Sequence, residues 1–157
     1  MQYPYMTQDL SSQESAAPEQ TGDETRRGRT ILVAEDDGDI RLMMTTLLGM
    51  KGYRVVEARD GQETLDVAQK ERPDVVLMDL QLPRLNGFAV ARFMRQSDAL
   101  RRTPIVVVSA HDPAKHRNLA LAAGCNAYVQ KPIDFDRLNE LIVSLLPQES
   151  LTQKSER

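Results

Sequence analysis

Acidic side chains directly follow two of the most apolar runs in the chain. Glu35 and Asp36 come after the run 31–34, and Asp79 comes after the run 75–78. Three carboxylates that converge on one site repel one another and raise their pKa values unless a cation lies among them. Oxygen ligands without a nearby histidine or cysteine favour Mg²⁺, with Mn²⁺ as a substitute, over zinc. These residues therefore predict a site for a small, hard divalent cation.

A hydroxyl group and an ammonium group follow two other apolar runs. Ser109 comes after the run 105–108, and Lys131 comes shortly after the run 127–129. An aspartate oxygen can attack phosphorus and form an acyl phosphate. A metal, an ammonium group, a hydroxyl group and backbone N–H groups can neutralise the oxygens of the transition state. The set therefore favours phosphoryl transfer onto a carboxylate.

The elements that must position these side chains alternate between strands and helices. Apolar runs of this kind, without polar alternation, predict strands covered on both faces, as in a parallel sheet. Between the runs the apolar period changes to that of an amphipathic helix. This pattern predicts a doubly wound α/β fold, in which ligands bind at the carboxyl ends of the strands. The five predicted strands are 31–34, 54–57, 75–78, 105–108 and 127–129.

Residues that favour helix ends support this division. Asp60 followed by Glu63 predicts a capping box that opens the second helix. Asp112 followed by Pro113 predicts an N-cap with proline at the first helical position, and Gly124 predicts a C-terminal cap. The spacing between strands fits right-handed βαβ crossovers.

Composition limits the class of protein and its boundaries. The chain has 157 residues, of which 20 are basic and 23 acidic, and this near-neutral balance argues against broad nucleic-acid binding. Its first residues include acids and no apolar h-region, so we expect no signal peptide, and it has no apolar run near the ~20 residues that span a membrane. The single Cys125 indicates a small buried side chain in a reducing cytoplasm. We expect a domain over 30–147, between a disordered extension (1–29) and a flexible tail (148–157).

Five short motifs follow one another at the ends of the predicted strands: Glu35-Asp36, Asp79 before Leu-Gln-Leu-Pro, Asn86-Gly87, Ser109-Ala110 and Lys131-Pro132. Together they resemble the receiver domain of two-component response regulators over about residues 30–147. The resemblance implies a five-stranded, flavodoxin-like (βα)5 receiver fold. It implies a signalling switch, not an enzyme with an external substrate, that takes its phosphoryl group from a histidine kinase or histidine phosphotransfer protein.

The resemblance also implies a role for each acidic position. Asp79 is expected to accept the phosphoryl group. Asp36 is expected to bind Mg²⁺ directly and Glu35 mostly through water, with Asp79 and the backbone carbonyl of Gln81 as further ligands. Glu35 stands where aspartate is more usual in the family.

The other matching residues are expected to serve the phosphoryl group and the switch. Ser109, in place of the commoner threonine, and Lys131 would contact the phosphoryl oxygens, and the small Ala110 would leave access to Asp79. Tyr128 would turn inward when Ser109 moves toward the phosphate, although it could equally be an ordinary half-buried strand aromatic. The peptide bond between Lys131 and Pro132 is expected to be cis.

The output of a stand-alone receiver would be a contact with a downstream protein. Residues after Pro147 are too few and too polar for an output domain. The contact is expected through the helix that starts at Pro113, the strand 127–129 and the helix that starts at Phe135.

Two other functions and one other metal site fit parts of the sequence. A receiver-fold adaptor that works without phosphorylation is one alternative. A phosphatase with an aspartyl nucleophile is another, although such enzymes resembling haloacid dehalogenases want an acid where Gln81 stands. His111 and His116 suggest zinc, but their spacing is expected to place them off one helical face, and further ligands are lacking.

Overall fold

The structure is a computed structural model that describes residues 26 and 28–147. The predicted extension and tail lie outside the described residues, apart from Arg26, Gly28 and Arg29. From Thr30 to Leu145, five strands alternate with five helices. The strands are β1 (Thr30–Ala34), β2 (Arg54–Ala58), β3 (Val75–Met78), β4 (Ile105–Ser109) and β5 (Ala127–Gln130). The helices are α3 (Gly38–Met50), α4 (Gly61–Glu71), α5 (Gly87–Gln96), α6 (Pro113–Ala123) and α7 (Phe135–Leu145).

The five strands form one parallel sheet in the order β2-β1-β3-β4-β5. All five predicted strands are confirmed, and no end differs from its prediction by more than one residue. This order is that of a flavodoxin-like fold, so the predicted fold class is confirmed. The strand order reverses between β1 and β3, which places the ligand-binding crevice of such a sheet at their carboxyl ends.

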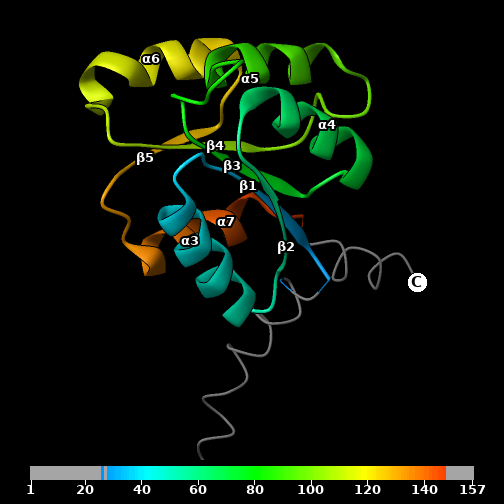
Figure 1. Cartoon of the computed structure of the whole chain (residues 1–157), viewed down its shortest axis with the longest axis vertical. Helices are drawn as coiled ribbons and strands as arrows, with labels where there is room; N and C mark the ends of the chain where they lie inside the picture. Colours follow the sequence, from blue (N-terminus) through cyan, green and yellow to red (C-terminus); the bar gives the residue numbers. More distant parts are fainter. Residues whose placement is uncertain (1–25, 27, 148–157) are drawn as a thin grey trace, which may run out of the picture.

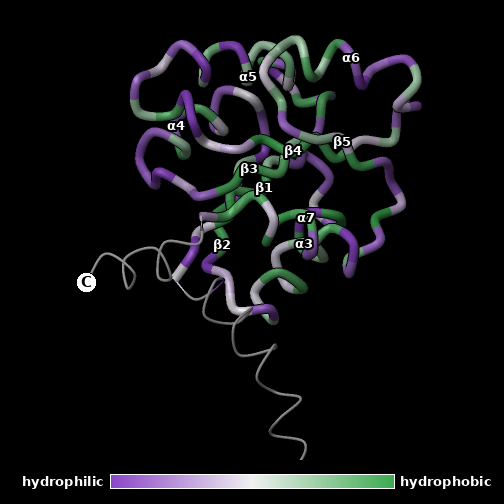
Figure 2. The backbone as a smooth tube through the Cα atoms, turned by 180° about the vertical axis from the view of Figure 1, so that it is seen from behind, coloured by the Kyte–Doolittle hydropathy of each residue, from purple (hydrophilic) through white to green (hydrophobic). Residues whose placement is uncertain are grey.

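Helices cover both faces of the sheet, as Figure 1 shows, with α4, α5 and α6 on one face and α3 and α7 on the other. The strands are the most hydrophobic part of the tube in Figure 2. Along β1, Leu32 packs in the core beneath α4, α5 and α6, whereas Ile31 and Val33 pack in the core beneath α3 and α7. Covering on both faces explains the unbroken apolar runs. Among the described residues, no helix is long and apolar enough to cross a membrane.

Two helices, α4 and α6, begin at predicted side-chain caps, and α6 also ends at its predicted glycine. Asp60 caps α4 by accepting a hydrogen bond from the Glu63 N–H at 2.7 Å. The Glu63 carboxylate accepts from the Arg59 N–H at 2.6 Å, so the capping box closes one residue earlier than the usual pattern. Asp112 caps α6, and Gly124 ends it with a φ of 110°. The N-caps Asp60 and Asp112 mark where two loops at the carboxyl edge of the sheet end.

Candidate functional site

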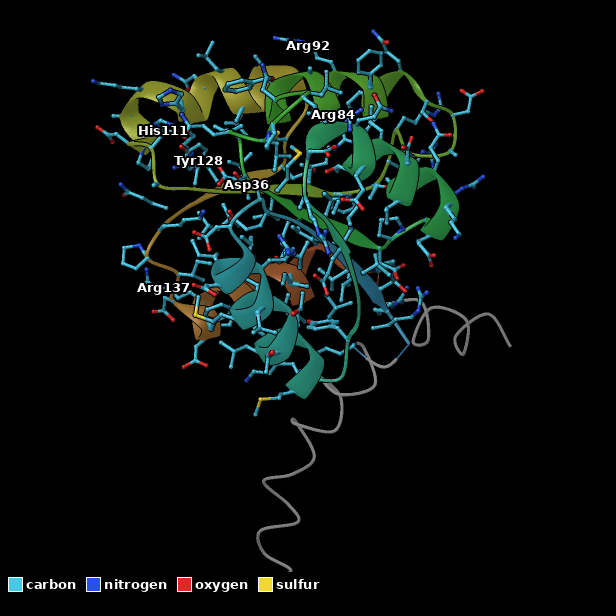
Figure 3. All side chains as sticks on the ribbon, viewed as in Figure 1. Asp36, Arg84, Arg92, His111, Tyr128 and Arg137 are labelled. Carbon is cyan, nitrogen blue, oxygen red and sulfur yellow. The ribbon has the colours of Figure 1, made fainter. Side chains whose placement is uncertain are left out.

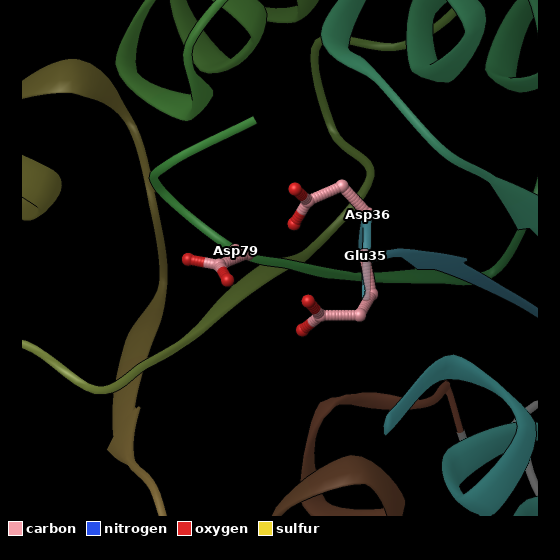
Figure 4. A group of neighbouring side chains, drawn as sticks. All are labelled: Glu35, Asp36 and Asp79. Atoms are coloured by element: carbon pink, nitrogen blue, oxygen red, sulfur yellow. The ribbon is translucent and has the colours of Figure 1, made fainter. Parts of the chain in front are cut away.

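Three carboxylates meet at the carboxyl ends of the two central strands β1 and β3. Glu35 and Asp36 follow β1 and Asp79 follows β3, and each offers an oxygen within 4.8 Å of the others. Figure 4 shows the three side chains grouped at this edge of the sheet. The Asp79 N–H donates to the carbonyl of Ala34 at 3.1 Å, which ties the two strand ends together. We call these three residues the acid cluster.

Lys131 joins the acid cluster from the loop after β5. Its Nζ lies 2.8 Å from Oε1 of Glu35 and 3.1 Å from Oδ2 of Asp79. The side chains of Lys131, Glu35 and Asp79 are only 15%, 3% and 12% exposed. The peptide bond between Lys131 and Pro132 is cis, as predicted. The structure therefore brings Lys131 together with two of the three predicted acids.

Burial and charge shift the pKa values of this ion pair. Burial raises the pKa of Glu35, and the hydrogen bonds from Lys131 and from the Asp37 N–H only partly oppose that rise. Burial alone would lower the pKa of Lys131, but its hydrogen bonds to Glu35 and Asp79 outweigh burial, so that pKa is raised. Three carboxylates against one ammonium group leave an excess of negative charge. All the ligand atoms are oxygens, which fits Mg²⁺.

The carboxylates of Glu35 and Asp79 each accept two hydrogen bonds. The third acid, Asp36, is exposed. The second oxygen of Glu35 accepts from the Asp37 N–H at 3.2 Å. The second oxygen of Asp79 accepts from the Gln81 N–H at 3.1 Å. The backbone of Gln81 therefore lies beside Asp79, and the predicted role of its carbonyl group stays a prediction.

Sequence reasoning missed a side chain that holds the end of β1. Arg41 of α3 donates from Nη1 to the carbonyl of Glu35 at 2.8 Å and from Nε to Oε1 of Glu57 at 3.0 Å. The Arg41 side chain is 13% exposed and that of Glu57 is 52% exposed, so the bond to the Glu35 carbonyl is the better shielded from water of the two. It fixes the backbone of an acid-cluster residue against α3 and β2. No local pattern marks this arginine, because its partners belong to other elements.

The backbone of His111 connects the two predicted switch residues. Ser109 is fully buried, and its Oγ accepts a hydrogen bond from the His111 N–H at 3.1 Å. The Tyr128 hydroxyl donates to the His111 carbonyl at 3.0 Å. Figure 3 shows His111 and Tyr128 beside each other under α6. Ala110, which lies between Ser109 and His111 in the sequence, is exposed, so the chain is open to solvent at this point.

The two histidines lie closer than their spacing suggested. The rings of His111 and His116 lie 4.6 Å apart and are tilted by 36°. The expectation that their spacing places them off one helical face does not apply to the pair, because His111 precedes the Asp112 cap and lies outside α6. Within the described part of the chain, only the acid cluster brings three metal-binding side chains together.

Comparisons with known proteins agree with this geometry. A family model described as response regulator receiver domain matches residues 31–143. The polar-differentiation response regulator DivK of Brucella anthropi is 34% identical over 118 residues, which cover 75% of this chain and 96% of that protein. DivK of Brucella ovis is 32% identical over the same shares.

Solved structures with the same fold include two with at least 30% identity. The receiver domain of the sensor histidine kinase PA1611 from Pseudomonas aeruginosa, solved with a magnesium ion in its active-site cleft, is 32% identical and superposes with a TM-score of 0.71. The match covers 75% of this chain and 97% of that one. Chemotaxis response regulator CheY4 of Vibrio cholerae is 30% identical with a TM-score of 0.71, over 76% of this chain and 99% of the other.

Proposed function

Since the chain belongs to the response regulator receiver domain family, we propose that it is a switch controlled by phosphorylation of Asp79. The phosphoryl donor is a histidine kinase or a histidine phosphotransfer protein. The observation that carries this proposal is the ammonium group of Lys131, which bridges Glu35 and Asp79 within hydrogen-bond distance. The switch works in the cytoplasm and acts on no external substrate.

In the proposed reaction an oxygen of the Asp79 carboxylate attacks the phosphorus of a phosphohistidine. A phosphorus–oxygen bond forms, the phosphorus–nitrogen bond of the donor breaks, and the imidazole leaves with its electron pair. Lys131 and the Gln81 N–H already lie 3.1 Å from the Asp79 oxygens, so they can stabilise charge there without moving far. After a shift toward the site, Ser109 would donate its hydroxyl proton to a phosphoryl oxygen, because its Oγ only accepts a hydrogen bond from the His111 N–H and its own proton is still available. The small Ala110 leaves room beside these oxygens.

Glu35, Asp36 and Asp79 are the residues that would hold Mg²⁺, with the carbonyl group of Gln81 as a further ligand. The all-oxygen donor set supports this assignment, as does the magnesium ion in the related PA1611 receiver domain. Bound Mg²⁺, or Mn²⁺ in its place, would supply positive charge to the phosphoryl oxygens. The exposed Asp36 carboxylate is the acid best placed to meet a hydrated cation, because the other two are held by protein partners.

The His111 backbone supplies the mechanical link of the proposed switch. Ser109 can approach a phosphoryl oxygen only by carrying its His111 N–H partner along or by releasing it. The first change displaces the His111 carbonyl, which is the acceptor for the Tyr128 hydroxyl, and the second removes a bond that holds the His111 backbone in place. Phosphorylation would thus shift Tyr128 by biasing an equilibrium between two loop arrangements.

The proposed output surface is formed by α6, β5 and α7, and it binds a downstream protein. Leu119 and Leu121 of α6 are 58% and 43% exposed, although they are apolar. A hollow of about 370 Å³ lies between β5 and α7, with Tyr128, Arg137 and Leu141 in its lining. A movement of Tyr128 would therefore change the shape of a surface that is open to a partner.

Intact mass measurement after incubation with acetyl phosphate and Mg²⁺ tests the proposal. Wild type is expected to gain one phosphoryl group, and Asp79→Asn is expected to gain none. Asp98→Asn is the matched control, because Asp98 is an exposed loop acid away from the cluster. Labelling of Asp79→Asn at the wild-type level would refute the acceptor assignment.

Two further readouts separate the alternatives. A folded wild-type chain that gains no phosphoryl group with Mg²⁺ would favour the adaptor. Steady turnover of a phosphate ester such as p-nitrophenyl phosphate would favour the phosphatase.

A further inference from the structure

An apolar groove runs over the outer surface between α3 and the start of α7. Two adjoining hollows of about 570 and 360 Å³ form it, and both are lined by Leu47 and Phe135. The first hollow reaches Lys131 and Pro132, beside the acid cluster. The second reaches Lys51, just past the end of α3. We call the two hollows together the α3–α7 groove.

Apolar side chains on α3 stay exposed around this groove. Leu42, Met43 and Met50 are 65%, 43% and 77% exposed. Met43 lines the first hollow and Met50 lines the second. Three exposed apolar residues on one helix, next to an apolar hollow, are typical of a binding surface.

The chain enters the described structure at the second hollow. The Arg26 side chain donates from Nε to the carbonyl of Lys51 at 2.6 Å, and Lys51 lines that hollow. A few residues later, Arg29 pairs with Asp74 at 3.5 Å and donates to the carbonyl of Pro147 at 3.1 Å. These contacts fix the point from which the preceding 25 residues start, at one end of the groove.

The composition of those 25 residues is divided in a way that suits this groove. Residues 11–25 contain no apolar side chain larger than alanine or proline, and the family match begins only at residue 31. Residues 1–10 hold two of the four tyrosines of the chain and two of its seven methionines. The bulky apolar side chains of this stretch are Met1, Tyr3, Tyr5, Met6 and Leu10.

The length of residues 11–25 allows residues 1–10 to reach the far end of the groove. Fifteen residues can span at most about 50 Å. The α3 helix has 13 residues, which correspond to a length of about 20 Å. Attachment to the same chain raises the effective concentration of residues 1–10 at the groove, so that even a weak apolar contact would be populated.

We propose that residues 1–10 bind in the α3–α7 groove of the same chain. The segment covers the exposed side chains of α3 and reaches the rim formed by Lys131 and Pro132. It therefore competes with any protein that contacts this rim. That consequence for a phosphoryl donor rests on the proposed function, whereas the binding itself does not.

Paramagnetic relaxation in the full-length chain tests the binding directly. A nitroxide is attached to Pro4→Cys. The native Cys125 stays unlabelled at neutral pH, because it is 5% exposed and burial raises the pKa of its thiol to about 11. The methyl signals of Met43 and Ile133, in the first hollow, are expected to lose at least twice as much intensity as that of Met50, next to the tether. The reverse gradient would overturn the proposal.

A control variant separates binding from simple tethering. It carries the same label, but serine replaces four of the five bulky apolar residues of the segment: Tyr3, Tyr5, Met6 and Leu10. The groove signals of this variant are expected to recover at least twofold. Unchanged attenuation would overturn the proposal. Attenuation of isotope-labelled, nitroxide-free chains mixed with nitroxide-labelled chains would assign the groove to a second copy instead.

Discussion

Replacing Lys131 by methionine should destabilise the metal-free protein strongly at neutral pH. The substitution keeps the length of the side chain but leaves Glu35, whose side chain is 3% exposed, without its ammonium partner. A hydrogen bond to a charged group contributes about 1.5–3 kcal/mol, and loss of one partner from a buried pair costs about 3–5 kcal/mol. The site lies at the edge of the sheet, and Lys131 itself no longer has to be desolvated. We therefore expect a loss of about 2–4 kcal/mol.

The size of this loss should depend on pH because of Glu35. Burial raises the pKa of Glu35 above its ordinary value of 4.5. A raised pKa gives stability that is fully present below pH 4.5 and is lost as pH rises through the folded-state value. Removing Lys131 removes interactions that lower this pKa, so the pKa rises further. The stability gap between wild type and Lys131→Met should therefore narrow as the pH falls from 7 toward 5.

Urea unfolding in EDTA at several pH values measures this gap. With a slope of about 2 kcal/mol per molar urea, the midpoint at pH 7 should fall by about 1–2 M. The control is Lys115→Met, which removes an exposed lysine of α6 and should shift the midpoint little. Added Mg²⁺ should restore part of the loss, because it offsets the same negative charges. A gap that is absent, or that stays constant with pH, would refute this account of the pair.

Two further predictions concern packing away from the acid cluster. Gly61→Ala should lower the free energy of unfolding by about 2 kcal/mol or more, because its Cβ would lie 1.7 Å from the Leu85 carbonyl oxygen. The matched change Gly49→Ala, whose Cβ would meet nothing within 4 Å, should instead stabilise α3 by up to about 1 kcal/mol. Equal urea midpoints for the two variants would contradict both expectations. Tyr53→Phe should cost about 1 kcal/mol, because it breaks the 3.1 Å bond to Asn139. Burial raises the pKa of Tyr53 to about 12. The free energy of unfolding of wild type should therefore fall between pH 10 and 12, whereas Tyr53→Phe has no phenol group to ionise and should lack this loss. Parallel pH profiles of the two proteins would contradict this expectation.

The sequence by itself determined the strands, several helix ends and the positions of the acids. Four consecutive apolar residues such as 75–78 can be satisfied only when both faces of a strand are covered, so the run itself encodes a central strand. Asp112 before Pro113 specifies a helix start through bonds between near neighbours. These signals depend only on neighbouring residues, so they can be interpreted without knowledge of the rest of the fold. The sequence was enough to predict that Glu35 and Asp79 lie close together, because the carboxyl ends of parallel strands lie at the same edge of the sheet.

Only the tertiary structure decided which partners these residues take. Lys131 lies 96 residues from Glu35 along the chain, and nothing local reveals that its ammonium group meets Glu35 and Asp79. The same holds for Arg41, whose Nε donates to Oε1 of Glu57, 16 residues further along the chain. The rings of His111 and His116 are close in sequence, but their contact depends on the path of the loop before α6. Such contacts depend on loop paths and rotamers that are fixed when the helices pack on the sheet. The physical reason is that local sequence encodes local hydrogen bonds and burial, whereas long-range polar pairs form only after folding brings distant segments together.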